Sequence, residues 1–172
     1  MKFSGQLSKF KVDESEVIKR LAVAIRSMQR EAGKEFIRSA QKRIPVLTGQ
    51  AKGTLIPLAE ELGILTELDF TPNSPHLDQR AKLQARGQSP ATGAMRGRFD
   101  FTETEKNYIL TIENDLEHYE RWENQRSSGG RGRWLSFAAG ALAFKRYVKQ
   151  YGHAHLLVFA QPGVIKRDRR RF

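Results

Sequence analysis

An apolar residue recurs every three or four positions across residues 17–44, and this spacing constrains the fold more than any other feature of the chain. Such spacing places apolar side chains on one face of an α-helix. The residues concerned are Val17, Leu21, Ile25, Met28, Ala32, Phe36, Ala40 and Ile44. Asp13 and Glu16 precede the pattern as an N-cap with its capping box, and Pro45 stops it because proline lacks a backbone N–H. The sequence therefore predicts one long amphipathic helix over residues 13–44.

The stretch after this helix, residues 43–53, is typical of a rigid break followed by a tight turn. Glycines accept positive φ and threonine favours turns, and we expect the apolar residues after the proline to lie beneath the turn. The predicted structural determinants are Pro45, Val46, Thr48, Gly49 and Gly53. We expect them to shape the chain and to take no part in catalysis.

The middle of the chain predicts strands and a long loop. Residues 54–57 favour a short strand or turn, and residues 64–70 favour a strand. Residues 71–97 hold several prolines and glycines and few apolar anchors, so they predict an extended arm or loop that orders on contact with a neighbour. Apolar and polar residues alternate in residues 98–105 and again in residues 108–114, which predicts a β-hairpin over residues 98–114.

The end of the chain begins with a glycine-rich basic loop, residues 125–133. An amphipathic pattern then predicts a second helix over residues 134–151, ending before Gly152. Residues 155–160 favour a short buried strand, and residues 164–172 form a basic tail. Together these elements predict an α+β fold: a long N-terminal helix, a small antiparallel sheet with a hairpin, a second helix and long extended loops.

Size and charge favour one domain that works by association. The chain has 172 residues, which we interpret as a single domain, and a net charge of +11. Its mean hydropathy of −0.57 is polar for a globule, so exposed loops or subunit interfaces are expected. The absence of cysteine excludes disulfides and thiolate chemistry. No apolar run is long enough for a membrane span and no secretory signal is seen, so we expect a soluble protein made in the cytoplasm.

The charges are unevenly distributed. Residues 79–98 and the tail are basic, whereas residues 100–123 carry eight carboxylates. Basic arms and an acidic middle favour pairing between copies of the same chain. The interface candidates are the arginines of these arms and loops together with an aromatic and acidic segment: Arg80, Arg86, Arg96, Arg98, Tyr119, Trp122, Glu123, Arg131, Arg133, Arg169, Arg170 and Arg171.

Two motifs in order resemble one protein family. A long helix ending in an arginine, followed by Pro45, Val46, Thr48 and Gly49, resembles the signature of the tailed-phage head–tail joining or tail completion (neck) proteins, which include the lambda minor tail protein Z group. The N-D-L-E-H-Y-E-R-W-E segment of residues 114–123, directly after the hairpin, is similar to a second motif of that family. Leu47 and Gln50 depart from the family pattern, which often has Asp or Arg there.

The resemblance implies an α+β subunit that assembles as a homo-oligomeric ring, expected to be a hexamer, in the neck of a virion. It further implies contacts with a connector or stopper, a tail terminator and the tail tube, with no cofactor and no membrane. The long helix is then either an interface helix of the ring or an ordinary core helix, two interpretations of equal weight. A tail terminator ring is the alternative within the same class.

Other classes of function receive less support. His153 and His155 have a spacing that would suit a metal site on a strand, but a structural role is favoured, and no metal or cofactor is predicted. The acidic region is more simply a solvated or partner-facing surface than an acid–base pair, so the chain is not predicted to be an enzyme. A basic nucleic-acid-binding protein is the alternative of another class. Incidental contact with DNA in a neck channel is compatible with the ring.

Overall fold

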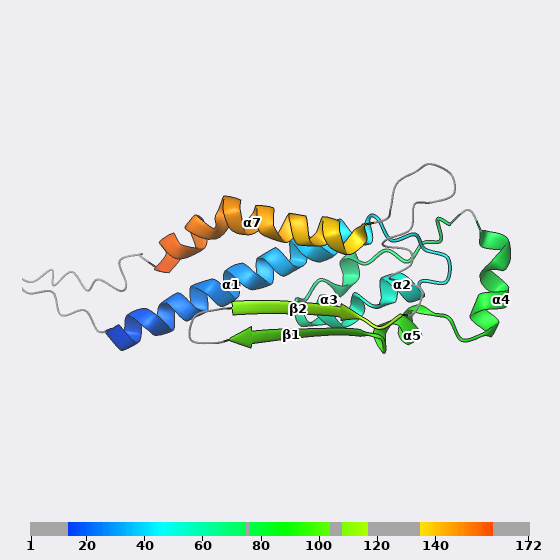
Figure 1. Cartoon of the computed structure of the whole chain (residues 1–172), viewed down its shortest axis with the longest axis horizontal. Coiled ribbons are helices and arrows are strands. Elements are labelled where there is room, and N and C mark those ends of the chain that lie inside the picture. Colours follow the sequence, from blue (N-terminus) through cyan, green and yellow to red (C-terminus); the bar gives the residue numbers. More distant parts are fainter. Residues whose placement is uncertain (1–13, 75, 104–107, 117–134, 160–172) are drawn as a thin grey trace, which may run out of the picture.

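Two long helices and a two-stranded antiparallel sheet run side by side along the molecule (Figure 1). The computed structural model describes residues 14–74, 76–103, 108–116 and 135–159. The elements are α1 (Glu14–Gln41), α2 (Gln50–Gly53), α3 (Ile56–Glu61), η1 (Leu65–Glu67), η2 (Leu77–Gln79), α4 (Arg80–Ala85), α5 (Pro90–Ala94), β1 (Gly97–Glu103), β2 (Tyr108–Asn114) and α7 (Ser136–Phe159). The predicted α+β class and the long N-terminal helix are confirmed.

Helices α1 and α7 pack antiparallel to each other (Figure 1). Side chains of α1 pack directly on the backbone of α7 at two glycines, because a Cβ on Gly140 would lie 2.7 Å from the ring of Phe36 and one on Gly152 would lie 3.1 Å from the Met28 sulfur. The Ser39 hydroxyl also donates a hydrogen bond to the Ala139 carbonyl, at 3.2 Å. The second helix is thus held against the first along one seam.

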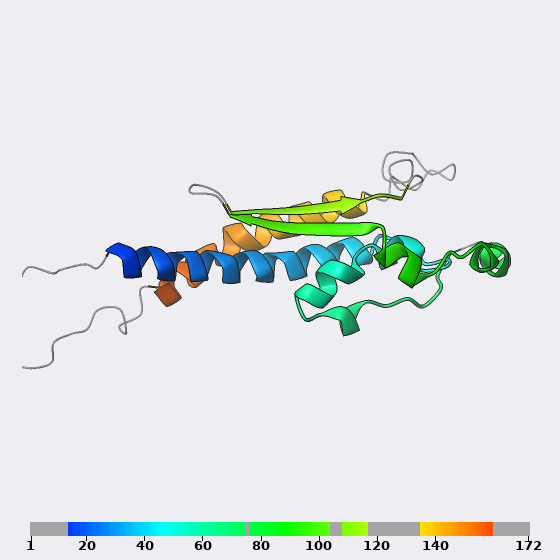
Figure 2. The same cartoon turned by 90° about the horizontal axis from the view of Figure 1, so that it is seen from below.

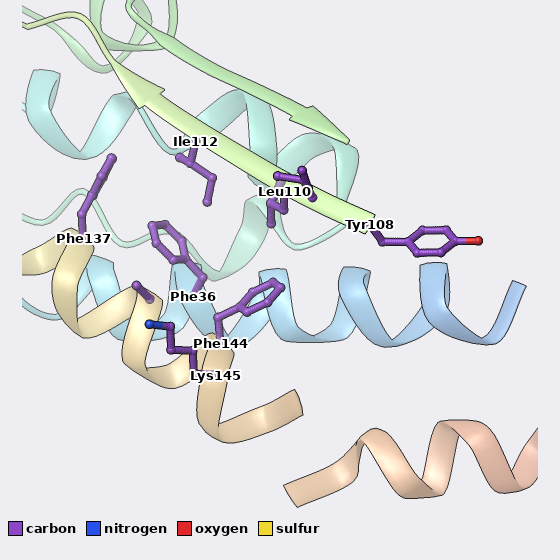
Figure 3. A pocket seen from close by; sticks show the side chains of 9 residues that line it. Phe36, Tyr108, Leu110, Ile112, Phe137, Phe144 and Lys145 are labelled. Atoms are coloured by element: carbon purple, nitrogen blue, oxygen red, sulfur yellow. The ribbon is translucent and has the colours of Figure 1, made fainter. Parts of the chain in front are cut away.

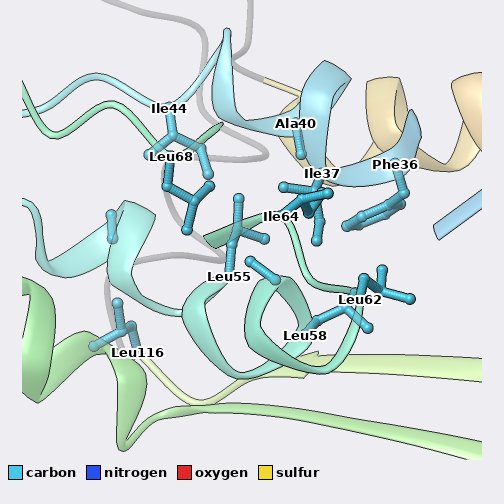
Figure 4. Packing of buried hydrophobic residues seen from close by; sticks show 12 residues of the cluster. Phe36, Ile37, Ala40, Ile44, Leu55, Leu58, Leu62, Ile64, Leu68 and Leu116 are labelled. Atoms are coloured by element: carbon cyan, nitrogen blue, oxygen red, sulfur yellow. The ribbon is translucent and has the colours of Figure 1, made fainter. Parts of the chain in front are cut away.

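The hydrophobic core lies beneath the second half of α1 (Figure 4). Ile37 and Ile44 from α1 and the turn after it meet Leu55 and Leu58 from the short helices, and all four side chains are almost fully buried. Gly33 brings α1 close to α3, since a Cβ there would lie 3.0 Å from a methyl carbon of Leu62. A larger residue at this position would therefore have to displace Leu62.

The hairpin was predicted correctly. Strands β1 and β2 pair antiparallel, with Phe99 opposite Ile112 and Phe101 opposite Leu110. These four side chains pack against the core, whereas the alternate residues are exposed, as expected for a sheet with one buried face. One face of the hairpin is therefore exposed to solvent, and the other face packs against the helices (Figure 2).

Before the hairpin, the structure differs from the prediction in three places. Helix α1 ends at Gln41, not at residue 44, and Arg43 closes a turn by donating to the Ala40 carbonyl at 3.0 Å. A short strand or a turn was predicted for residues 54–57; the turn is present at Thr54 and Leu55, and α3 follows at once, with Pro57 in its first turn, where the missing N–H costs nothing. The strand predicted for residues 64–70 is absent, and η1 lies there instead. The apolar residues of this region recur at three- and four-residue steps, and that helical spacing prevailed over the alternating one.

Two further segments were wrong later in the chain. Residues 71–97 are only partly a loop, since they contain η2, α4 and α5. The strand predicted for residues 155–160 is absent because α7 continues to Phe159. Gly152 does not end the helix as predicted; it lies inside α7, at the contact with Met28. The basic tail, residues 164–172, lies outside the described residues.

Candidate functional site

The predicted break and turn at residues 43–53 are present, and α2 forms the last four residues of the stretch. Gly49 has a φ of 84°, in the left-handed region that suits glycine, and Val46 and Thr48 are buried. The Val46 N–H donates to the Asn73 side-chain oxygen at 2.7 Å, and its carbonyl accepts from the Asn73 N–H at 2.9 Å. These two hydrogen bonds therefore hold the end of residues 64–73 against the turn.

The turn also fixes α5, which packs across α2. A Cβ on Gly53 would overlap the carbonyl oxygen of Pro90, and a Cβ on Gly93 would overlap the carbonyl oxygen of Gln50. One on Gly97 would in turn overlap the Thr54 carbonyl oxygen. Two G-x-x-x-G spacings, at residues 49–53 and 93–97, thus bring two backbones into direct contact. Sequence reasoning missed the second pair, although its matching spacing was a usable signal.

Lys52 of α2 is a buried cation that the sequence analysis did not single out. Its side chain is 5% exposed, and its Nζ donates to the Asp69 carbonyl at 2.6 Å. Burial lowers the pKa of Lys52 below 10.5, and the nearby Asp69 carboxylate partly opposes this. The side chain therefore ties α2 to the chain that follows η1, and it is not free to meet a partner.

Between the turn and α5 lies an arm, defined here as residues 76–88, that stands away from the body (Figure 1). No residue of α4 is buried. Both ends of the arm are fixed: Asn73 and Ser74 bond to the Val46 carbonyl, and Ser89 caps α5 by accepting a hydrogen bond from the Thr92 N–H. The arm is thus a projection on a rigid base.

The predicted interface arginines separate into two groups. Arg80 and Arg86 lie on the arm. Arg96 and Arg98 lie at its base, where Arg96 approaches Asp115 at 3.5 Å and Arg98 lies opposite Glu113 in the sheet. The structure therefore does not gather the four into one cluster. The remaining candidates lie outside the described residues: Tyr119, Trp122, Glu123, Arg131, Arg133, Arg169, Arg170 and Arg171.

The charged face of α1 pairs within the chain. Arg38 bonds Glu67 of η1 through two hydrogen bonds of 2.7 Å, and Arg30 bonds Glu61 of α3 at 2.6 Å. Hydrogen bonding to Arg38 holds the pKa of Glu67 below 4.5. At the tip of the hairpin, Arg26 pairs with Glu103, which lowers the pKa of that carboxyl too. These arginines fasten α1 to the body and are not spare charges for a partner.

An apolar groove of about 430 Å³ separates β2 from α7 (Figure 3). Phe36 of α1 lies at its floor, β2 forms one wall, and Phe137, Ala141 and Phe144 of α7 form the other. Most of these side chains are only partly buried. Its residues are far apart in the sequence, so the sequence analysis had no local pattern from which to predict it.

Metal sites and membrane-spanning helices bear on other classes of function. Within the described residues, no three His, Asp or Glu side chains come together in a way that would hold a metal ion. In the same part of the chain, every helix is too short or too polar to cross a membrane. No protein-family model, curated protein or solved structure matches this chain.

Proposed function

We propose that this chain is a virion structural protein of a tailed phage that completes the tail and joins it to the head as a ring of identical subunits. The proposal rests on the resemblance of two ordered sequence motifs to neck proteins. It takes its structural support from one observation: a basic arm projects from a base that the turn holds rigidly. An arm of this kind suits contact with a neighbouring subunit.

The proposed ring is a hexamer that matches the sixfold tail. Its neighbours are the connector or stopper on the head side and the terminator or tube on the tail side. Assembly requires apolar burial and charge complementarity, and no reaction is catalysed. The chain carries a net charge of +11, which suits an acidic partner surface and also contact with DNA passing through the ring.

Deletion of the arm tests this proposal. Residues 76–88 are replaced by a short Gly-Ser linker, which leaves the Val46–Asn73 bonds and the Ser89 cap in place. We expect a folded subunit that no longer forms a ring, measured by size-exclusion chromatography with light scattering. We also expect it to lose head–tail joining in an extract that lacks the wild-type protein. A deleted chain that assembles and joins normally contradicts the role of the arm.

A charge-reversal pair serves as the matched control. Arg80→Glu with Arg86→Glu changes the arm, and Arg146→Glu with Lys149→Glu changes the net charge equally on exposed positions of α7. The arm variant should lose joining activity and the α7 variant should keep it. Equal losses would indicate that overall charge matters and not the arm, and a saturable, steeply salt-dependent affinity for DNA would then favour the nucleic-acid-binding alternative.

A further inference from the structure

The groove between β2 and α7 follows the free edge of the sheet. Tyr108, Ile109 and Leu110 are consecutive in β2, and all three line it. Neighbouring side chains of a strand point to opposite faces, so a hollow that meets all three runs along the strand's edge. Strand β1 occupies the other edge of β2, and the described sheet has no third strand. Every second residue of β2 therefore directs its backbone N–H and C=O toward the groove.

The shape and chemistry of the groove suit one extended segment. Such a segment would pair its backbone with the edge of β2 and direct alternate side chains down onto Phe36. Phe137 and Phe144 of α7 stand opposite β2 and would enclose those side chains (Figure 3). The occupant thus needs apolar residues at every second position.

Residues 8–12, S-K-F-K-V, have this alternation. With Phe10 and Val12 in the groove, Lys9 and Lys11 would lie on the solvent face of the sheet. That face carries the exposed carboxylates of Asp100 and Glu113, with Arg98 the cation between them. The pattern of the segment therefore matches the groove on its apolar side and the sheet on its charged side.

The segment cannot reach the groove of its own chain. The Arg26–Glu103 pair places the tip of the hairpin level with Arg26, and α1 begins at Glu14, about 18 Å farther along the helix axis at 1.5 Å per residue. Phe10 precedes Glu14 by four residues, which extend over at most about 14 Å. The start of α1 projects beyond the sheet, as Figure 2 shows, and a neighbouring copy is the nearest molecule able to accept the segment.

We propose that residues 8–12 of one copy add as a third strand to β2 of the next copy, within its β2–α7 groove. This rests on the ring proposed above and names one of its contacts. Because donor and acceptor are different surfaces, the contact is head-to-tail, the kind of contact that generates a ring when the rotation between neighbours closes.

Filling the groove tests the acceptor. Ala141 and Ala138 are both exposed on α7, but only Ala141 lines this groove. Ala141→Trp should raise the concentration needed for half-assembly by about tenfold or more, since it displaces a buried aromatic contact. Ala138→Trp should leave assembly unchanged. A ring of Ala141→Trp chains that forms at the wild-type concentration overturns the proposal.

Cysteine cross-linking tests the donor, because the natural chain has no cysteine. Chains with Lys11→Cys are mixed with chains that carry Ile109→Cys, Thr111→Cys or Glu113→Cys, so that the register need not be known. At least one mixture should yield a disulfide-linked dimer of the two different chains. A chain with Ala138→Cys, exposed on α7 but outside this groove, is the control. Linkage no faster than in this control overturns the proposal.

The two proposals fail in different ways. A ring that forms without cross-linking to β2, and that tolerates Ala141→Trp, removes the strand-addition contact and leaves the ring. A wild-type chain that stays monomeric in light scattering at all concentrations, with no cross-linking, removes both.

Discussion

At the scale of single residues, Gly53 shows how little space the turn leaves. A Cβ there would overlap the Pro90 carbonyl oxygen, so Gly53→Ala must push α5 away from α2. We expect a loss of about 2–3 kcal/mol in the free energy of unfolding, as for overpacked cores. Gly63 is the control, because it has a φ of 72° but open space around it. Gly63→Ala should cost about 1 kcal/mol from backbone strain alone. Equal losses in urea titrations would contradict the close contact.

Lys52 gives a prediction that depends on pH. Its pKa is lowered in the folded protein because burial disfavours the ammonium ion. Between that lowered pKa and 10.5 the unfolded chain binds more protons, so Lys52 makes the free energy of unfolding increase as pH rises through this window. Lys52→Met removes the titrating group. The free energy of unfolding of the wild type minus that of Lys52→Met should therefore increase as the pH rises toward 10.5. Parallel curves for the two proteins would contradict the burial of the charge.

At the scale of elements, the pair between Arg38 and Glu67 fastens η1 to α1. Glu67→Gln should lower the free energy of unfolding by less than about 1 kcal/mol, because both side chains are over a third exposed. The pKa of Glu67 is lowered when folded, so this contribution is complete above 4.5 and is lost as pH falls below it. Arg20–Glu16 lies within α1 alone and serves as the control. A Glu67→Gln effect that does not diminish in acid or in high salt would contradict this role.

The elements also differ in how far the sequence could predict them. The hairpin and α1 follow from local periodicity, and in each of them one face packs against the rest of the molecule while the other is exposed, as that periodicity requires. The strand predicted for residues 64–70 failed because Ile64 and Leu68 are buried by contacts with distant residues. Likewise Gly152 does not end α7; it lies inside the helix, where it leaves room for Met28, which is far away in the chain. Tertiary packing decided both cases, and only the Ser89 and Thr92 capping box gave a local signal for α5.

In the candidate site too, some features follow from local sequence patterns and others from contacts between distant segments. The turn residues Pro45, Thr48 and Gly49 were identified because turn chemistry is local. The partner of the turn, α5, and the depth at which Lys52 is buried follow from contacts between segments far apart in the sequence. The groove belongs to three elements at once and has no sequence signature of its own.

At the scale of the whole molecule, ring formation and joining depend on apolar and charged contacts in different proportions. The ring has the apolar groove as well as the basic arm, whereas joining through the tail relies on charge. Salt screens exposed charges but does not weaken apolar burial. We therefore expect 0.5 M NaCl, an ionic strength at which the Debye length is about 4 Å, to reduce joining to heads far more than it reduces the mass of the ring in light scattering.

Charge reversal in the tail separates these two steps further. The triple change Arg169→Glu, Arg170→Glu and Arg171→Glu should leave the ring intact and should weaken joining most at low salt, where the wild-type attraction is strongest. The measurements are the mass of the ring and the ratio of joined particles to free heads. Since the groove needs none of these arginines, a variant that loses its ring would show that the tail is part of the subunit contact. A variant that joins as well as wild type at every salt concentration would show that the partner is recognised elsewhere on the subunit.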